Sequence, residues 1–455
     1  PTDLQVRNSN TSSSQIIFPG AIVYYKNQSI AVNFLKNQIT NTPAENINYS
    51  IENLEYEFIS SILKILKNQT DKIAFLEGHG ELNNNNLYDI IKSVVNDNFK
   101  LSYYFNVERF NIKEFVIDST TMQPDIKEQI NNLCKYKAII IAKPTLPFNN
   151  LDKLIIDQYI MNGGKVLWLI DGVHASMDSL QNNKRSFISI KNSLNIDDQL
   201  FKYGVRINAD LIEDLRCIEI PIITGYSNNL PQQKFFSWPF SPLLTLNKTH
   251  PISKGIDAVK SEFVSSIDTI QNKLKKTILL TSSTQSRLIM SPSKIGLSIL
   301  ENPPLLETYN SSHIPTAILL EGEFESVFKN RILSKNHKIN IKTESPENKM
   351  IVIADGDIIS NDISEKGNIY PLGYDKYINY TYDGNKFFII NAIQYLCDNN
   401  SISLLKGKSL KLRMLNKKKI KNNKILIQTI NILTPLILVF LIFFYFNYLQ
   451  KKTYK

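Results

Sequence analysis

The stretch KAIIIA at residues 137–142 is a short, continuous run of apolar residues, and KVLWLI at residues 165–170 is a second run of the same kind. Between them, residues 151–161 have the spacing of a helix, and the Gly163–Gly164 pair is expected to end that helix in a left-handed conformation. Short apolar strands that alternate with helices are typical of a parallel sheet covered on both faces. The sequence therefore predicts an α/β fold with a Rossmann-like, doubly wound, mostly parallel sheet.

The same alternation starts earlier, with a strand at 72–76, a helix at 87–96 and a strand at 101–107. After Asp171 the pattern is looser, and the expected elements are strands at 218–223, 263–267, 277–281, 316–321 and 350–354, followed by a helix at 385–396. The last strand and helix are able to complete the same sheet. We expect one α/β region over residues 71–400, with two lobes, 71–215 and 216–400, as an option.

The N-terminal segment, residues 1–70, has a different pattern. Its first 14 residues are polar and are expected to be loose, whereas 17–25 and 29–35 predict a hairpin. Residues 44–66 predict a helix with one apolar stripe, which should pack on another element. The stripe comprises Ile47, Ile51, Leu54, Phe58, Ile62 and Ile65.

The C-terminal segment predicts a membrane anchor. Residues 425–449 contain no Asp, Glu, Lys, Arg or His. At about 1.5 Å per residue, a helix of this length crosses a hydrocarbon core of about 30 Å with some tilt. A buried core helix is the alternative, but such helices are usually shorter and keep a polar face. Gln428, Asn431 and Pro435 share one side of the helix, and a partner helix or the lipid headgroup region could satisfy them.

Charge near this anchor is concentrated in the juxtamembrane segment 401–424, which carries nine Lys or Arg, while the tail 450–455 carries three. Lipid headgroups are a better match for these charges than nucleic acid, although the formal net charge is +10. A simple positive-inside count would place the body in the cytoplasm, but that rule applies to short loops and not to long domains. No GxxxxGK[ST] phosphate loop is present, so energy for any transport must come from a partner.

Three places invite a catalytic or metal-binding interpretation. Glu77, His79 and Glu81 follow the strand at 72–76, where open α/β sheets bind ligands. Acid, imidazole and acid at alternate positions could form an acid/base pair or a metal site. Gly78 and Gly80 are equally well explained by a tight turn, which we consider the more common use of such a pattern.

The second place is the carboxylate group Asp355, Asp357 and Asp362, which follows an apolar strand and could bind Mg²⁺ or Ca²⁺. Its spacing does not match an EF-hand, and Asp residues often cap turns. The third is a Cys/His pair of the amidotransferase kind. Cys134, Cys217 and Cys397 do not sit on a sharp turn after a strand, so this hypothesis would require His79 or His174 to lie beside one of them. We expect no cofactor and no catalytic centre.

Six motifs along the chain are long and specific: IAFLEGHGEL (73–82), FPGAIVYY (18–25), SIENLEYEFIS (50–60), GGKVLWLIDGV (163–173), SWPFSPLL (237–244) and IVIADGDIISN (351–361). Together they closely resemble the family of the gliding-motility protein GldG of Bacteroidetes. The resemblance spans roughly residues 16 to 450. It implies an auxiliary subunit of an ABC-type transporter, grouped with a separate ATPase and a polytopic permease.

The resemblance further implies a body outside the cytoplasm, anchored in the inner membrane and facing the periplasm. The α/β sheet of this family is similar to sheets found in some enzymes. A shared sheet carries no catalytic activity by itself. The function expected from the sequence is thus a non-enzymatic, membrane-anchored transporter subunit. A cell-envelope enzyme or a ligand-binding module that uses the turn after residue 77 is the alternative.

Overall fold

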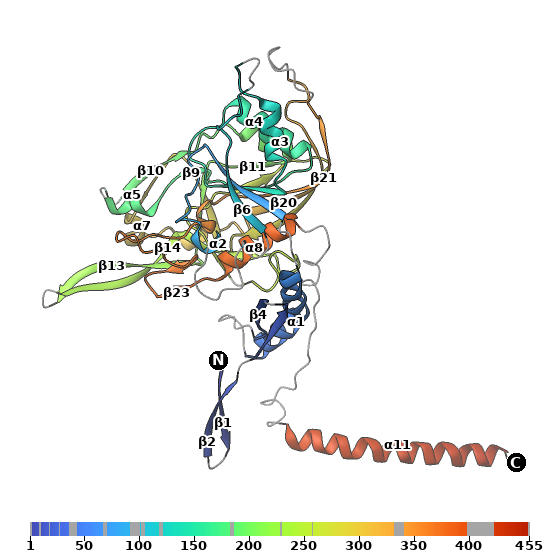
Figure 1. The fold of residues 1–455 in the computed structure, drawn as a ribbon. Helices are drawn as coiled ribbons and strands as arrows, with labels where there is room; N and C mark the ends of the chain where they lie inside the picture. The colour runs from blue at the N-terminus through green and yellow to red at the C-terminus, as the bar shows by residue number, and fades with distance from the viewer. Residues whose placement is uncertain are drawn as a thin grey trace.

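The structure is a computed structural model, shown in Figure 1. It describes residues 2–8, 11–17, 19–26, 28–35, 43–66, 71–91, 101, 105–117, 122–182, 186–227, 230–256, 258–331, 341–397 and 423–453. The predicted helix 87–96 falls partly outside these ranges, and so does most of the basic segment 401–424.

A large mixed sheet forms the body, and its strands follow the order β13-β14-β17-β20-β21-β8-β7-β5-β6, with β15 added to β14. One half is parallel: β5 Asp71–Glu77, β6 Phe105–Asn111, β7 Ala138–Ala142, β8 Lys165–Leu169 and β21 Glu344–Ile353. The other half is antiparallel: β13 Cys217–Ser227, β14 Leu230–Leu246, β15 Val259–Lys260, β17 Lys275–Thr281 and β20 Pro315–Glu325. The predicted α/β class is confirmed, but the prediction of a mostly parallel sheet is wrong, because the sheet is mixed and parallel in one half only.

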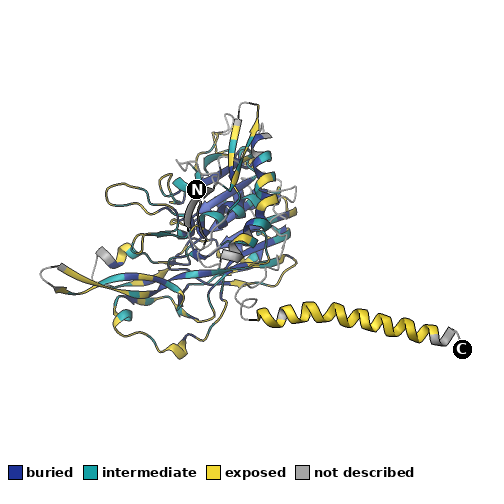
Figure 2. Cartoon of the chain, turned by 90° about the horizontal axis from the view of Figure 1, so that it is seen from below, coloured by how far each residue is buried: buried dark blue, intermediate teal, exposed yellow. Residues whose placement is uncertain are grey.

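Helices cover both faces of the parallel half, which explains why its strands are apolar on both sides. All five residues of β7 are buried. One face packs against α3 Ile126–Leu133, α4 Asn150–Met161 and α6 Asp197–Tyr203. The opposite face packs against α2 Tyr88–Ile91 and α8 Gly384–Cys397. The buried strands lie at the centre of the body in Figure 2.

The helix α4 begins and ends as the sequence predicts. Asn149 and Asp152 form a capping box at its start. Gly163, with φ +91°, follows its last turn in the left-handed region. The chain then enters β8, and the loop that carries Asp171 follows at the other end of this strand.

The rest of the body is built from small sheets around a third core that includes Trp238, Phe240 and Phe263. These sheets pair β10 with β9 and β19, β11 with β16, β12 with β18 and β22 with β23. Their bounds are β9 Val173–His174, β10 Ser186–Lys191, β11 Val205–Ile207, β12 Asp210–Asp214, β16 Ile267–Thr269, β18 Ser286–Met290, β19 Ser293–Gly296, β22 Tyr374–Asp375 and β23 Tyr380–Thr381. Short helices α5 Met177–Asn182 and α7 Ser298–Glu301 accompany them. The strand predicted at 263–267 is thus mostly loop.

The N-terminal segment contains the predicted hairpin, β3 Gly20–Tyr25 with β4 Gln28–Asn33, and the predicted helix α1 Pro43–Leu66. A further hairpin, β1 Thr2–Asn8 with β2 Thr11–Ile17, replaces the loose segment that we expected. Its strands carry few apolar residues, so their composition gave no strand signal. Tyr56 of α1 donates a hydrogen bond to Gln394 of α8 at 3.1 Å, which links this segment to the body.

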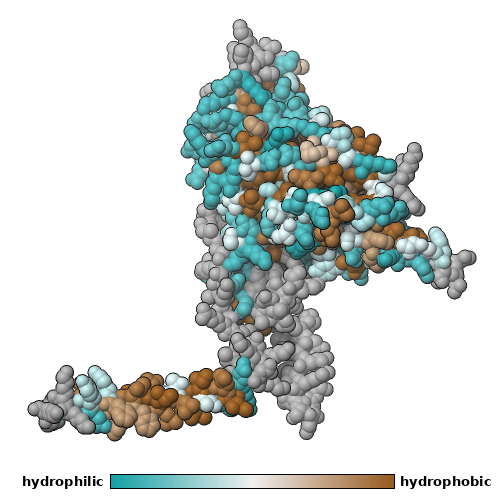
Figure 3. All heavy atoms as spheres, turned by 180° about the vertical axis from the view of Figure 1, so that it is seen from behind, coloured by the Kyte–Doolittle hydropathy of each residue, from teal (hydrophilic) through white to brown (hydrophobic). Residues whose placement is uncertain are grey.

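The C-terminal helix α11 runs from Lys424 to Thr453, and all of its residues whose burial is described are exposed, as Figure 2 shows. Figure 3 shows that the surface of this helix is mostly hydrophobic. Within the described residues, Lys424–Gln450 is the one helix long and apolar enough to cross a membrane. This agrees with the predicted anchor. The 30-residue helix contains Pro435 without ending there.

Candidate functional site

The loops that follow the parallel strands gather most of the polar candidates. Strands β5, β7, β8 and β21 are parallel, so their carboxyl ends meet at one edge of the sheet. His79 follows β5, Lys143 follows β7, Asp171 follows β8, and Asp355 follows β21. These residues form two separate clusters, one around His79 and one around Lys143.

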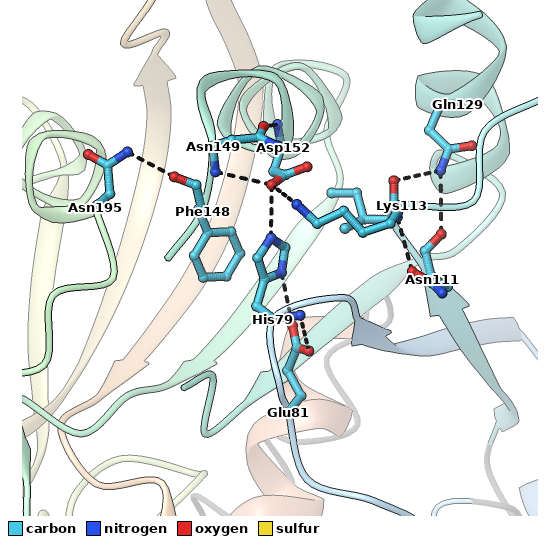
Figure 4. A network of polar contacts seen from close by, with 10 residues as sticks. His79, Glu81, Asn111, Lys113, Gln129, Phe148, Asn149, Asp152 and Asn195 are labelled. Atoms are coloured by element: carbon cyan, nitrogen blue, oxygen red, sulfur yellow. Dashed lines mark hydrogen bonds and ion pairs between the residues drawn. The ribbon is translucent and has the colours of Figure 1, made fainter. Parts of the chain in front are cut away.

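His79 is completely buried and lies between two carboxylates, as Figure 4 shows. Its Nε2 lies 3.0 Å from Asp152 Oδ2, and its Nδ1 lies 3.2 Å from Glu81 Oε1. The backbone N–H of His79 also donates to Glu81 Oε2 at 2.7 Å. The imidazole stacks on Phe148 with ring centroids 3.6 Å apart.

This environment favours the charged form of the imidazole. Burial lowers the pKa of His79, but the hydrogen bonds and charges of Asp152 and Glu81 outweigh burial and raise that pKa. Burial by itself raises the pKa of Asp152. The hydrogen bonds with His79 and Lys113 outweigh burial, so the pKa of Asp152 is lowered. In the charged form, which the carboxylates facing the two ring nitrogens favour, both nitrogens are donors and neither offers a lone pair to a substrate.

The predicted trio of Glu77, His79 and Glu81 is therefore brought together only in part. Glu77 points elsewhere and pairs with Arg109. Asp152 and Lys113 complete the cluster instead, through an ion pair to each other. Sequence reasoning missed Asp152, although the spacing Asn149-x-x-Asp152 at a helix start was a readable capping signal.

The two glycines of this turn have conformations that other residues rarely adopt. Gly78 has φ +128° and Gly80 has φ +71°. A Cβ on Gly80 would lie 2.2 Å from Thr145 Oγ1. The His79 carbonyl accepts hydrogen bonds from the N–H groups of Thr145 and Leu146, so the turn is packed directly on the loop after β7. The turn interpretation of these glycines fits the geometry.

The second cluster contains Asp171, Asp355 and Asp357. One carboxylate oxygen of each lies within 4.8 Å of the other two, and this is the one such group within the described residues that could hold a metal ion. The ammonium group of Lys143 lies among them, 3.4 Å from Asp171 Oδ2 and paired with Asp357. The chain's own cation thus pairs with two of these three carboxylates.

Burial dominates the electrostatics of this cluster. It raises the pKa of Asp355, and the neighbouring charges of Asp357 and Asp171 raise it further. Burial also raises the pKa of Asp171, although Lys143 opposes it. The same cause brings the pKa of Glu262, a neighbour in this region, to about 7. Burial lowers the pKa of Lys143, but Asp357 and Asp171 more than offset it and raise that pKa.

The predicted set of Asp355, Asp357 and Asp362 needs correction at one position. Asp362 lies beside Lys260, at 3.9 Å, with a side chain 59% exposed, and is not part of the three-carboxylate group. Asp171 takes its place. Asp171 comes from the loop after β8. The parallel pairing of β8 with β21 places this loop beside the loop that carries Asp355.

Two of the three cysteines, Cys134 and Cys217, have no activated thiol. Cys134 is exposed and Cys397 is buried, and neither forms a disulfide. Burial raises the pKa of Cys134, and burial together with Asp214 raises the pKa of Cys217 to about 12. An activated nucleophile requires the opposite shift. These two thiols therefore do not support the amidotransferase hypothesis.

The fold and these two clusters define a class of protein: a mixed α/β body with buried, internally balanced polar clusters, followed by a candidate membrane anchor. The family model described as "ABC-type uncharacterized transport system", an auxiliary family of ABC transporters, matches residues 70–392. The chain belongs to this family.

Comparison with solved structures gave the "mmIFT52 N-terminal domain", with 13% sequence identity and a TM-score of 0.38. The match covers 72% of this chain and 99% of that one. This TM-score is too low to establish a shared fold. No curated protein matched the sequence.

Proposed function

We propose that this chain is a non-enzymatic, membrane-anchored auxiliary subunit of an ABC-type transporter complex, working with a separate ATPase and a permease. The observation that carries the proposal is the family match over residues 70–392, which covers nearly the whole α/β body. The resemblance to the GldG family of Bacteroidetes supports a complex of the gliding-motility kind. The absence of a phosphate-loop motif from the sequence supports a separate ATPase.

The parallel half of the sheet serves this role as a rigid scaffold. Its strand order, β6-β5-β7-β8-β21, fits a Rossmann-like, doubly wound arrangement. Both polar clusters at its carboxyl edge are occupied by internal counter-charges, His79 in one and Lys143 in the other. This supports a structural use of the edge over catalysis, and it weighs against an enzyme or a ligand-binding module at the turn after residue 77.

Affinity purification from membranes in mild detergent tests the subunit assignment. The tagged full chain should recover an ATPase and a polytopic permease, identified by mass spectrometry. A matched chain that ends at residue 423, before α11, should recover much less of both. Recovery of the full chain alone, at a yield that shows intact extraction, would contradict the proposal.

The body faces the periplasm in this proposal, with α11 in the inner membrane and the basic juxtamembrane segment near lipid headgroups. An impermeant maleimide tests the orientation on intact spheroplasts. Leu305 is 74% exposed and suits a single cysteine, placed in a Cys134→Ser background because Cys134 is exposed. Labelling before lysis is expected. Labelling only after lysis would place the body in the cytoplasm.

A further inference from the structure

The hairpin of β13 and β14 extends beyond the body as a two-stranded ribbon, as Figures 1 and 2 show. Its base belongs to the third core, where Ile220, Trp238 and Phe240 are buried. The pairing of the two strands continues outward as far as Ser227 and Leu230. On the way, the side chains become exposed, and residues 231–235 are all exposed. The body therefore covers the base of the ribbon and leaves its outer part open.

The inner face of the ribbon packs against the body. In an antiparallel pair, directly opposite residues share a face, and neighbours along each strand alternate between faces. Ile220, which pairs with Phe236, is buried in the third core, and Ile222 packs against the same core. Lys234 and Gln232 continue this face toward the tip. The inner face is thus apolar at its base and polar farther out.

The outer face of the ribbon is apolar and exposed. Tyr226 is 72% exposed, Ile223 is 50% exposed and Phe235 is 43% exposed. A register shift between Ile223 and Gly225 keeps Tyr226 on the same face as Ile223. The cross-strand pairs of this outer face are Pro221 with Phe235, Ile223 with Gln233 and Tyr226 with Pro231. The next pair toward the base, Glu219 with Ser237, is polar and ends the apolar surface.

The size and charge of the outer face indicate what covers it. A stable protein–protein interface uses about 20–30 residues a side, and the three pairs of the outer face offer six. Residues 220–233 contain no Asp, Glu, Lys, Arg or His, so the face has no charge with which to select a charged partner. Ile, Phe and Tyr side chains suit the interface of a lipid bilayer, where the tyrosine hydroxyl stays hydrated. A lipid surface therefore fits this face better than a second protein surface.

A bilayer is within reach of the ribbon if α11 anchors the chain. The segment between Cys397 at the end of α8 and Lys424 at the start of α11 can span at most roughly 90 Å. The anchor also makes contact between the ribbon and the membrane intramolecular, which raises its effective concentration. A contact too weak to bind a separate molecule is thus strong enough here.

We infer that the outer face of the β13–β14 ribbon lies on the headgroup region of the bilayer that α11 spans, as a second, uncharged membrane contact that orients the body. The inference rests on the membrane anchoring in the proposed function. The contact is shallow, because β13 is an edge strand of the large sheet and its outer backbone groups need water as a hydrogen-bond partner.

Spin labels on the full chain provide the first test. Gln233 and Gln232 are matched positions, because they are adjacent, exposed and on opposite faces of the ribbon. Each is replaced by Cys in a Cys134→Ser, Cys217→Ser background, and the purified chain is placed in phosphatidylcholine nanodiscs without any other subunit. Collision rates of the nitroxide with oxygen report lipid, and those with a water-soluble nickel chelate report water.

We expect the label at Gln233 to be accessible to oxygen and protected from nickel, and the label at Gln232 to show the opposite. High salt should change neither result, because the outer face is uncharged. The background chain without a new cysteine measures any labelling of Cys397, which is buried. Water accessibility at both positions would overturn the inference. Equal lipid accessibility at both would overturn it as well, because the ribbon would then insert without regard to its faces.

Paired substitutions provide the second test. With the label at Gln233, Tyr226→Glu should abolish the protection from nickel, because it places a charge on the outer face. Gln232→Glu adds the same charge on the inner face and should leave the protection unchanged. Tyr226 and Gln232 are both exposed, so both variants should keep the thermal unfolding midpoint of the parent chain. Full protection in the Tyr226→Glu chain would show that another surface meets the lipid.

The outcomes separate this inference from the proposed function. If the full chain enters nanodiscs and the label at Gln233 remains in water, the ribbon contact is wrong and the anchor stands. If the chain does not enter nanodiscs, α11 is not an anchor and both proposals fail. Recovery of an ATPase and a permease from membranes is measured independently of either label.

Discussion

The two carboxylates beside the buried His79 favour the positively charged form of its imidazole. Removing one member of such a cluster leaves the others uncompensated away from water, which costs more than the lost contact itself. The same reasoning applies to Lys143, whose ammonium group balances Asp171 and Asp357. At the level of residues, the carboxyl edge of the sheet is thus held together by two internal charge clusters.

The substitution His79→Ala should lower the free energy of unfolding by about 3 kcal/mol, because Glu81 and Asp152 lose their shared counter-charge. Glu77→Gln is the control. Its ion pair with Arg109 is partly exposed, so the loss should be under about 1 kcal/mol. Denaturant unfolding of both variants makes the comparison. Equal losses would mean that His79 is not a charged group in the folded state.

The pH dependence of the same cluster has a definite sign. The folded-state pKa of His79 is raised above 6.5, so its stabilisation is complete below about pH 6.5 and is lost as the pH rises through the folded-state pKa. The difference in unfolding free energy between wild type and His79→Ala should therefore shrink on going from pH 6 to pH 9. A difference that grows with pH would contradict the charged imidazolium.

Gly80→Ala should destabilise the chain by about 1 to 3 kcal/mol, because φ +71° disfavours any side chain and the new Cβ meets Thr145. Gly225 offers a matched control, since a Cβ there would have no heavy atom within 4 Å. Gly225→Ala should change stability by less than about 0.5 kcal/mol. Thermal unfolding of the two variants side by side decides whether the turn is as constrained as its geometry indicates.

Lys143→Met should lower the free energy of unfolding by about 3 to 5 kcal/mol, since Asp171 and Asp357 lose the cation that pairs with them. Millimolar Ca²⁺ or Mg²⁺ should restore part of this loss, while the wild-type chain should not respond. The control is Lys191→Met, whose exposed pair with Asp197 should contribute under about 1 kcal/mol. A wild-type chain stabilised by divalent cations to the same extent would instead show that the cluster binds metal beside Lys143.

At the scale of elements, the polar residues of the apolar helix α11 differ in where their side chains find hydrogen-bond partners. Thr429 and Thr434 donate their hydroxyl groups to the carbonyls of Ile425 and Ile430, at 2.9 Å and 2.7 Å, so the helix itself satisfies them. Gln428 and Asn431 lie on one side of the helix and have long carboxamides, which a neighbouring helix can satisfy. This side is the expected contact with a membrane-embedded partner.

Replacing Gln428 and Asn431 together by Leu should preserve insertion into the membrane, because the helix becomes more apolar. Recovery of the permease should fall if the carboxamides meet it. Thr429→Val serves as the control, because its hydroxyl is already satisfied within the helix. Undiminished recovery by the double variant would leave α11 as an anchor only.

Elements with a strong apolar pattern could be predicted from sequence, and contacts between distant loops could not. The strands at 137–142 and 165–170 and the stop at Gly163 follow from local residues alone. The partnership of Asp171 with Asp355 depends on β8 pairing with β21, nearly two hundred residues later. For α1, periodicity gave the helix correctly but not its neighbours, because its contacts with the hairpin β3–β4 and the hydrogen bond from Tyr56 to Gln394 depend on tertiary structure.

At the scale of the whole molecule, the family match shows an auxiliary protein of an ABC-type transport system, and the apolar helix α11 is compatible with a membrane anchor. In the proposed function, the body is a scaffold and the polar side of α11 is a surface for a partner, so that the role arises from assembly and not from chemistry at the sheet edge.

Native mass spectrometry of the tagged full chain, extracted in mild detergent, tests this central claim most directly. We expect an assembly that releases, on activation in the gas phase, this chain together with an ATPase subunit and a polytopic membrane subunit. Species at only whole-number multiples of this chain's own mass, from extracts in which other membrane complexes remain intact, would contradict the account.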